Sequence, residues 1–296
     1  MPARFTTVMY LLAASAAEPT LVEDFPRGGT QVQEALANAQ GRGDGPSRCP
    51  KRGFCFKTTG EMCTGLALFS SLRPWFYGWA NLPANPEDYS KCTLQYDSGF
   101  VPMVWGGGTT PIVNMNVSAG AAALLGFNEP NHKKQSNMTG PQAAQLWPQV
   151  ESLAKANYIS RLISPAAAPC SDPDRCVGEA IDWFDAFFAA CSGCKVDALA
   201  THSYVCNVSK LETYLTELHD RYRLPIWLTE YNCNIDHPTG QQLEYMQQAV
   251  PMLESLDFVE KYAWFEAPSD KFPMAGLIDN NTQLTQLGQW YRDAPC

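Results

Sequence analysis

Two glutamates are notable because each one follows a run of apolar residues. Glu129 lies in an Asn-Glu-Pro-Asn sequence directly after the run 121–127, and Glu230 directly follows the run 224–229. Both runs have the composition of buried strands, so each carboxylate would stand at the carboxyl end of a strand. A pair of carboxylates is what acid–base and nucleophilic chemistry at a glycosidic bond requires. Asn-Glu-Pro alone occurs in many turns, and the second glutamate makes the pattern specific.

The elements that must position these glutamates are short strands alternating with helices. The predicted strands are largely apolar without alternation, as in sheets covered on both faces, and span residues 53–57, 75–79, 100–105, 123–127, 162–165, 197–202, 225–230 and 261–265. Helices are predicted to begin at caps formed by Thr139, Ser209 and Thr239, and over residues 177–191.

Eight such strands predict an α/β protein, namely a (β/α)8 TIM barrel formed as a single domain by residues 53–296. A doubly wound open sheet is the alternative, and it would carry a glycine-rich phosphate-binding turn after an early strand. The one candidate, the three glycines 106–108, follows the third strand and lacks the dinucleotide-binding spacing. Barrel active sites lie at the carboxyl ends of strands, so this fold would bring Glu129 and Glu230 together.

Other residues at these strand ends suit sugar binding. An amide can hydrogen-bond a ring hydroxyl, and aromatic rings can stack on the apolar faces of pyranoses. The residues expected to bind substrate are Asn128, Trp79, Trp105, His202, Tyr204, Tyr231, Trp264 and Phe265. For His202 the alternative is a buried structural role, and Trp75 and Tyr77 are assigned to packing.

Four motifs carry a resemblance to a known family. They are Gly126-Phe-Asn-Glu-Pro-Asn131, Phe100-Val-Pro-Met-Val-Trp-Gly106, Thr201-His-Ser-Tyr204 and Ile226-Trp-Leu-Thr-Glu-Tyr231. This set resembles glycoside hydrolase family 128, whose members are mostly β-1,3-glucanases. The resemblance implies a retaining (β/α)8 enzyme with Glu129 as acid/base, Glu230 as nucleophile and a neutral β-1,3-glucan as substrate. No cofactor or metal is expected, because the two carboxylates supply all the proton transfers.

Three alternatives remain open from the sequence. One is a secreted β-glucan-binding protein with little or no turnover, although both glutamates are present. Another is a structural wall protein, although repeats and low-complexity tracts are lacking. The third is a related retaining barrel acting on another neutral β-glycan, such as a β-1,4-mannan or a galactan.

The charge balance limits the classes of partner. The chain has 30 acidic and 21 basic residues, for a net charge of −9, and no basic cluster larger than a pair. Nucleic-acid binding is therefore not expected, whereas a neutral polysaccharide is indifferent to the field of an acidic protein. No run reaches the roughly 18 apolar residues that span a membrane. We expect a monomer.

Several features predict an extracellular or cell-wall protein. Residues 1–17 read as a secretory signal peptide. Eleven cysteines suit an oxidising compartment. Four Asn-x-Ser/Thr sequences offer glycosylation sites at Asn116, Asn137, Asn207 and Asn280.

The odd number of cysteines raises the question of processing. Residues 18–52 are predicted to be a pro-segment or a disordered extension that ends in the dibasic pair Lys51-Arg52. Cleavage there would remove Cys49 and leave ten cysteines. The alternative is that Lys51-Arg52 opens the first strand.

Two disulfides are predicted from position along the chain. Cys191 and Cys194 suit a local bond at a helix end better than a redox motif. Cys206 and Cys233 follow the ends of neighbouring predicted strands, where their Cα atoms would be close enough to bond. The alternative for these two is pairing with Cys170 or Cys176.

Overall fold

The computed structural model describes residues 49–56, 62–83, 99–108, 111–234, 237–267, 272–279 and 283–296. The predicted signal peptide, most of the predicted pro-segment and the sequon at Asn280 lie outside these residues. Within the described ranges, no helix is both long enough and apolar enough to cross a membrane.

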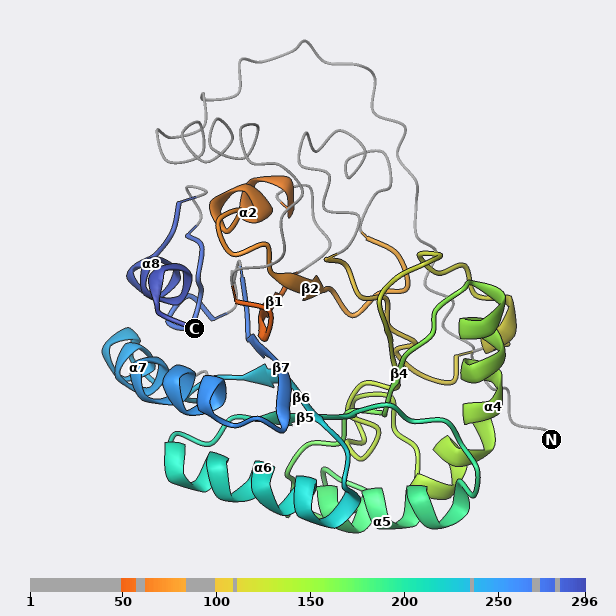
Figure 1. Cartoon of the computed structure of the whole chain (residues 1–296). Coiled ribbons are helices and arrows are strands. Elements are labelled where there is room, and N and C mark those ends of the chain that lie inside the picture. The colour runs from red at the N-terminus through yellow and green to blue at the C-terminus, as the bar shows by residue number, and fades with distance from the viewer. Residues whose placement is uncertain are drawn as a thin grey trace, which may run out of the picture.

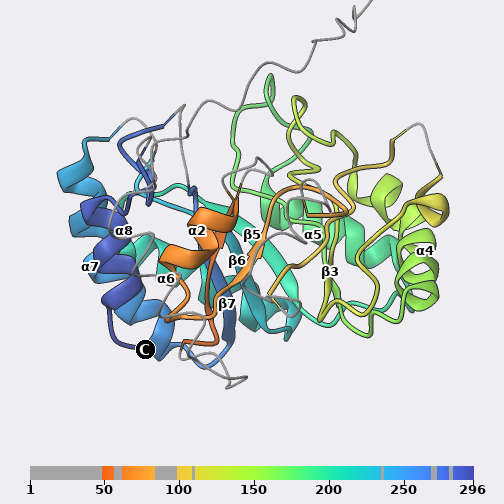
Figure 2. The same ribbon diagram turned by 90° about the horizontal axis from the view of Figure 1, so that it is seen from above.

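Parallel strands form the centre of the molecule (Figures 1 and 2). A five-stranded sheet has the order β2-β1-β7-β6-β5, made of Trp75–Tyr77, Arg52–Cys55, Val259–Trp264, Ile226–Tyr231 and Leu199–Ser203. A parallel pair is formed by β3 (Leu124–Leu125) and β4 (Leu162–Ile163). The protein is therefore an α/β fold built on parallel strands.

Isolated parallel bridges connect these two groups of strands. Ile163 of β4 bridges to Ala198, and Leu125 of β3 bridges to Met103. Phe100 bridges in turn to Phe76 of β2. The predicted strand 100–105 is thus present only as isolated bridges. Pro102 lies within it and has no N–H to donate to a ladder, which accounts for the interruption.

Helices surround the strands in both views (Figures 1 and 2). They are α2 (Met62–Leu68), α4 (Gly140–Ala156), α5 (Ala180–Ala190), α6 (Val208–Tyr222), α7 (Thr239–Ser255) and α8 (Gln286–Asp293), with a 3-10 turn η1 at Ile112–Asn114. Their apolar faces contribute to one large buried cluster with the outward-facing strand residues. A second, smaller cluster contains no helix residue and includes Cys55, Tyr77 and Trp227.

Two of the three predicted helix caps are wrong. Thr139 caps α4 as expected, in a reciprocal capping box with Gln142. The cap of α6 is Asn207, two residues before Ser209, because its side chain accepts the Lys210 N–H and asparagine is a strong N-cap residue. Thr239 is the first helical residue of α7 and follows Pro238.

The two ends of the described chain are joined. Cys49 forms a disulfide with Cys296, and Arg52 begins β1 with no exposed surface. The Arg52 guanidinium donates to the carbonyls of Tyr291 and Ala294, and it pairs with Glu254. This arrangement favours the alternative in which Lys51-Arg52 opens the first strand. Of the cysteines assigned in the described residues, Cys55 is the free thiol, and Cys49 is bonded.

Three further disulfides hold loops. Cys191 is bonded to Cys194, and Cys206 is bonded to Cys233 with a Cα–Cα distance of 4.1 Å, both as expected from the sequence. The third bond joins Cys170 to Cys176. The described sequon residues Asn116, Asn137 and Asn207 are all exposed.

Candidate active site

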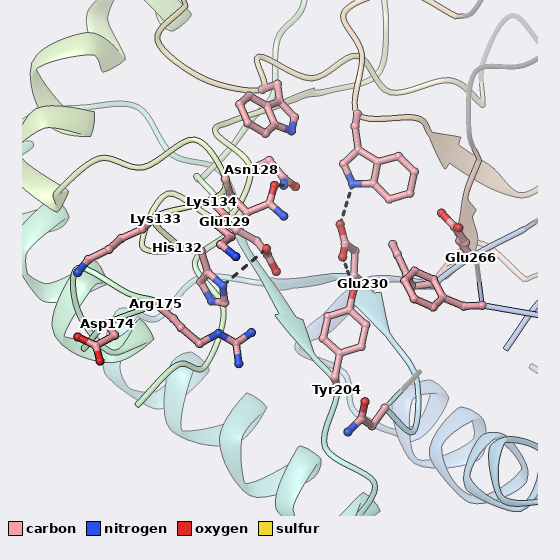
Figure 3. A pocket seen from close by; sticks show the side chains of 16 residues that line it. Asn128, Glu129, His132, Lys133, Lys134, Asp174, Arg175, Tyr204, Glu230 and Glu266 are labelled. Carbon is pink, nitrogen blue, oxygen red and sulfur yellow. Dashed lines mark hydrogen bonds and ion pairs between the residues drawn. The ribbon is translucent and has the colours of Figure 1, made fainter. Parts of the chain in front are cut away.

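A pocket of about 900 Å³ lies over the carboxyl ends of the strands and contains both glutamates (Figure 3). Part of the lining is an aromatic wall, in which Phe265 is in ring contact with Trp79, Tyr204 and Phe272. Another part is a cationic wall made of His132, Lys133, Lys134 and Arg175, and Figure 3 shows His132, Lys133 and Arg175 on the other side of Glu129 from Tyr204 and Glu230. Glu230 contacts the aromatic wall and Glu129 contacts the cationic wall.

Glu230 lies near the end of β6 and accepts three hydrogen bonds. Trp79 Nε1 and the Tyr77 hydroxyl donate to Oε1 at 2.7 and 3.2 Å, and the Tyr204 hydroxyl donates to Oε2. Burial raises the pKa values of both tyrosines well above normal, so they remain donors. Burial and the Glu129 charge also raise the pKa of Glu230, while His202, Tyr204 and Trp79 act in the opposite direction. Glu230 is therefore buried, but hydrogen-bond donors surround its two carboxylate oxygens.

Glu129 follows β3 by four residues and has a left-handed backbone conformation, with φ of 37°. Such a φ is uncommon for a residue with a side chain and is typical of functional positions. Burial acts to raise the pKa of Glu129, but the hydrogen bond from His202 and the charges of His202 and His132 lower it overall. The His132 ring lies 3.9 Å from Oε2.

His202 lies between the two carboxylates. Its Nδ1 is 3.1 Å from Glu129 Oε1 and 3.4 Å from Glu230 Oε2. One carboxylate oxygen of each glutamate and one ring nitrogen of His202 all lie within 4.8 Å of one another. Burial acts to lower the pKa of His202, but the two carboxylates raise it overall. A protonated His202 would therefore balance part of their charge.

The sequence and structure of the chain match known glycosidases. A family model described as the glycosyl hydrolase catalytic core matches residues 53–291. A glycoside hydrolase family 128 (subgroup II) endo-β-1,3-glucanase from Sorangium cellulosum is 33% identical, with 83% of this chain and 98% of that chain covered and a TM-score of 0.69. The chain belongs to glycoside hydrolase family 128.

Two other relatives extend the comparison for this family 128 glycosidase. A subgroup I endo-β-1,3-glucanase from Amycolatopsis mediterranei, solved with laminaritriose, is 31% identical over 82% of this chain and 98% of that chain, with a TM-score of 0.62. Alkali-sensitive linkage protein 1 of Schizosaccharomyces pombe is 32% identical over 222 residues, which are 72% of this chain. The match spans only 38% of that curated relative.

The family 128 enzyme brings together most of the predicted substrate-binding residues. Asn128, Trp79, Trp105, Tyr204 and Phe265 all line the pocket. His202 does not line it and lies fully buried in contact with the two glutamates. Its Nε2 has no hydrogen-bond partner among the described residues.

Tyr231 and Trp264 are corrections to the predicted site. Both are completely buried outside the pocket, with their rings 5.1 Å apart and in edge contact. Successive residues of a strand point to opposite faces, so Tyr231 points away from the side on which Glu230 lies. Trp264 differs in the same way from Phe265, and its indole N–H donates to the Ala275 carbonyl.

Sequence reasoning missed several residues of the site. Tyr77, assigned to packing, donates to Glu230, and its place at the carboxyl end of β2, two residues before Trp79, was the available signal. Cys55 lies beside it, with Sγ 3.2 Å from the Thr229 carbonyl, and burial raises the pKa of this thiol well above normal. The remaining missed lining residues are His132, Lys133, Lys134, Gln135, Asp174, Arg175, Asn234, Glu266 and Phe272.

Three groups in the described residues have the composition of metal ligands. Two of them contain the disulfide-bonded cysteines Cys170 and Cys176 or Cys206 and Cys233, whose sulfurs are not thiolates. The third is Glu129, His202 and Glu230. Its Glu230 oxygens already accept hydrogen bonds from three protein donors, an arrangement suited to a carboxylate that acts directly.

Proposed function

We propose that this family 128 protein is a retaining β-1,3-glucanase in which Glu129 is the acid/base and Glu230 the nucleophile. The observation that carries this proposal is the approach of their oxygens to within 4.8 Å. Retaining enzymes hold their carboxyl groups about 5–5.5 Å apart, whereas inverting enzymes separate them by about 6.5–9.5 Å to admit a water. The close approach supports covalent catalysis.

We further propose that the strands close into a (β/α)8 barrel. The isolated bridges Ile163–Ala198, Met103–Leu125 and Phe76–Phe100 support this, because they connect neighbouring strands all the way round to β2. The expected site at the carboxyl ends of the strands is also consistent with it.

The chemistry would run in two steps. Glu230 attacks the anomeric carbon to form an ester bond while the glycosidic C–O bond breaks and Glu129 gives its proton to the departing oxygen. Water then attacks the same carbon, loses a proton to Glu129 and releases Glu230 as a carboxylate. The three donors on Glu230 suit a group that must leave as an anion.

The pKa directions in the free enzyme run opposite to these roles, because the pKa of Glu129 is lowered and that of Glu230 is raised. His202 offers a solution, since it lies 3.1 Å from Glu129. Moving one proton from His202 to Glu129 converts an ion pair into a neutral acid beside a neutral imidazole. The number of protons in the site does not change, so Glu129 can become an acid without exchange with solvent.

The substrate would be a β-1,3-glucan. The related solved enzymes are described as β-1,3-glucanases, and one of them was solved with laminaritriose. The aromatic wall supports this proposal, since Trp79 and Phe265 line the pocket and aromatic rings can stack on sugar rings.

We also propose that the protein is secreted, acts outside the cell or in the cell wall, and is a monomer. Disulfides persist in oxidising compartments, and the described chain contains four of them. Exposed asparagines in three sequons are compatible with glycosylation at Asn116, Asn137 and Asn207.

The test is product analysis on a panel of β-1,3-, β-1,4- and β-1,6-linked glucans, mannan and galactan. We expect reducing-sugar release from the β-1,3-linked polymer, with the β-anomer formed first in a time-resolved proton NMR spectrum. First formation of the α-anomer would reject retention. Tight oligosaccharide binding with no hydrolysis of any polymer would instead identify a binding protein.

A further inference from the structure

The loop between Cys170 and Cys176 holds an arginine at the edge of the pocket. The disulfide closes this loop, and an antiparallel bridge joins Cys176 to His132. The Lys133 N–H donates to the Arg175 carbonyl at 2.8 Å. The Lys133 side chain donates to the Pro173 carbonyl at 2.8 Å. The backbone of Arg175 is therefore fixed to the segment that directly follows Glu129.

The Arg175 side chain has no protein partner in the described part of the chain. Other arginines are paired with carboxylates, namely Arg52, Arg161, Arg221, Arg223 and Arg292. Arg175 is exposed and lines the pocket, and Figure 3 shows its guanidinium on the same side as His132 and Glu129. Lys134, also exposed and pocket-lining, likewise has no ion pair among the described residues. A guanidinium held by a fixed backbone but left unpaired is available to a ligand.

The cationic wall is also a local reversal of the protein's charge. The whole chain carries −9, and the carboxylates of Glu129, Asp174, Glu230 and Glu266 also line the pocket, yet Lys133, Lys134 and Arg175 gather on this wall. Because the pocket holds charges of both signs, its attraction for an anion is confined to groups that reach Arg175 and Lys134 directly. Neutral glucan would not use this field.

Buried polar atoms beside the wall also lack partners. Asn128 is 4% exposed and lines the pocket, and its Oδ1 has no hydrogen-bond partner among the described residues. The same is true of His132 Nε2. Buried polar atoms usually have partners, and an amide oxygen accepts hydrogen bonds, so Asn128 Oδ1 suits a hydroxyl of a sugar that adjoins the cationic wall.

We infer that the cationic wall binds an anionic substituent on the substrate, a carboxylate or sulfate carried by a sugar on the leaving-group side of the cleaved bond. This inference rests on the proposed function. In an in-line displacement, the departing oxygen lies on the far side of the anomeric carbon from Glu230 and next to Glu129. The sugar that departs therefore lies toward the wall that contacts Glu129.

The choice of arginine fits this role. A guanidinium can bind a carboxylate or sulfate through two parallel hydrogen bonds, which an ammonium cannot do. Because Arg175 and Lys134 are exposed, the preference should be modest and sensitive to salt.

The experiment compares soluble β-1,3-glucan oligosaccharides in three forms: neutral, oxidised to carboxylate at C6, and sulfated at C6 to the same degree. For the wild-type protein we expect kcat/KM to be about three- to fivefold higher for at least one anionic form at low salt. The preference should disappear at about 0.5 M NaCl, where screening reaches within a few ångströms. The carboxylate and sulfate arms identify which anion the wall accepts.

Variants localise the effect. Arg175→Gln combined with Lys134→Gln should reduce the ratio of anionic to neutral kcat/KM to about one, and Arg175→Lys should keep part of it. Asp174→Asn should increase the ratio, since it removes the carboxylate next to Arg175 in the chain. Lys155→Gln, an exposed lysine in the last turn of α4, is the matched control and should leave the ratio unchanged. Unchanged melting temperatures would verify folding.

An equal loss of kcat/KM on neutral and anionic substrates in the double variant would overturn the inference, because Arg175 would then bind ordinary hydroxyls. A wild-type ratio of one at low salt would also overturn it. If the wild type hydrolyses no form, the proposed function fails, and calorimetric binding of the three oligosaccharides to Glu230→Gln still tests the wall. Stronger binding of an anionic form there would support the inference.

Discussion

The two walls of the pocket are constructed differently. Most of the aromatic wall lies directly at strand ends. Tyr204 directly follows β5, Phe265 directly follows β7 and Trp79 follows β2 by two residues. The cationic wall comes from loops after β3 and β4, which are held together by the Cys170–Cys176 disulfide and backbone hydrogen bonds.

This difference suggests that one wall controls the rate of reaction and the other controls which substrate is preferred. The aromatic wall fixes Glu230 through Trp79 and Tyr204, so its geometry is coupled to the core. Among the described residues, the cationic wall is paired with Glu129 through His132, whose Nδ1 lies 3.9 Å from Glu129 Oε2. We therefore expect changes on the aromatic side to affect the rate of every substrate, and changes on the cationic side to affect which substrate is preferred.

The strongest test of the comparison is Glu230→Gln. The change keeps the shape of the side chain but removes the charge that attacks the anomeric carbon, so hydrolysis should fall by at least ~10⁴-fold. Oligosaccharide binding, measured by calorimetry, should be nearly unchanged. Substantial residual activity would mean that Glu230 is not the nucleophile.

The next largest effect is expected for Glu129→Gln. Loss of the proton donor should slow hydrolysis of β-1,3-glucan polymer by ~10²–10⁴-fold. An activated aryl glycoside needs little protonation, so it should still form the covalent intermediate. We expect that intermediate to accumulate and to be visible by mass spectrometry of the intact protein, and added azide should release it as a glycosyl azide. Full activity of this variant on polymer would reject the assignment of Glu129.

Tyr204→Phe tests how the aromatic wall controls Glu230. The hydroxyl donates to the carboxylate and lowers its pKa, so removing it should raise the pKa further above its ordinary value. Because the nucleophile must be ionised, the acid limb of the kcat/KM profile should move to higher pH, with about a tenfold loss at the optimum. Arg175→Gln serves as the comparison from the cationic wall and should leave that limb in place. A uniform loss without a shift would mean that Tyr204 acts only by packing.

The smallest effect on rate is expected for the Cys206–Cys233 bond, which ties the loop after Tyr204 to the chain after β6. Replacing both cysteines with serine should destabilise the fold by about 3.5 kcal/mol, according to the chain-entropy estimate for this loop length. Replacing Cys191 and Cys194, which close a loop of three residues, should cost about half as much. Denaturant unfolding measures both. We expect kcat to fall a few-fold in the Cys206/Cys233 variant and to stay unchanged in the Cys191/Cys194 variant. Equal losses of kcat in the two variants would contradict a specific role for the loop after Tyr204.

The aromatic side was more predictable from sequence than the cationic side. Glu230 and Tyr204 could be predicted because Glu230 lies at the end of β6 and Tyr204 directly follows β5. Tyr231 and Trp264 were placed wrongly because strands buried on both faces do not alternate, so the sequence does not reveal which residues face inward. Arg175 was missed because its position depends on a disulfide and on contacts with residues far away along the chain.

The fold shows the same division. The apolar runs predicted β6 to within one residue at each end, since its hydrophobic pattern is local, but the predicted strand 261–265 misses the first two residues of β7. The segment 100–105 was predicted as a strand but forms only isolated bridges, because Pro102 prevents a continuous ladder. Helix caps failed where two capping residues compete within a few positions, as Asn207 and Ser209 do at α6.

The bond between Cys49 and Cys296 gives the catalytic unit an unusual mechanical property. It joins positions 247 residues apart, so the polypeptide between them is a covalent ring. Tension applied at these two cysteines would pass through the sulfur atoms and bypass the hydrogen bonds of β1 and the packing of α8. A single proteolytic nick anywhere within the ring would leave one connected molecule instead of two fragments. An enzyme that works in a stretched polymer network, among proteases, would benefit from both properties.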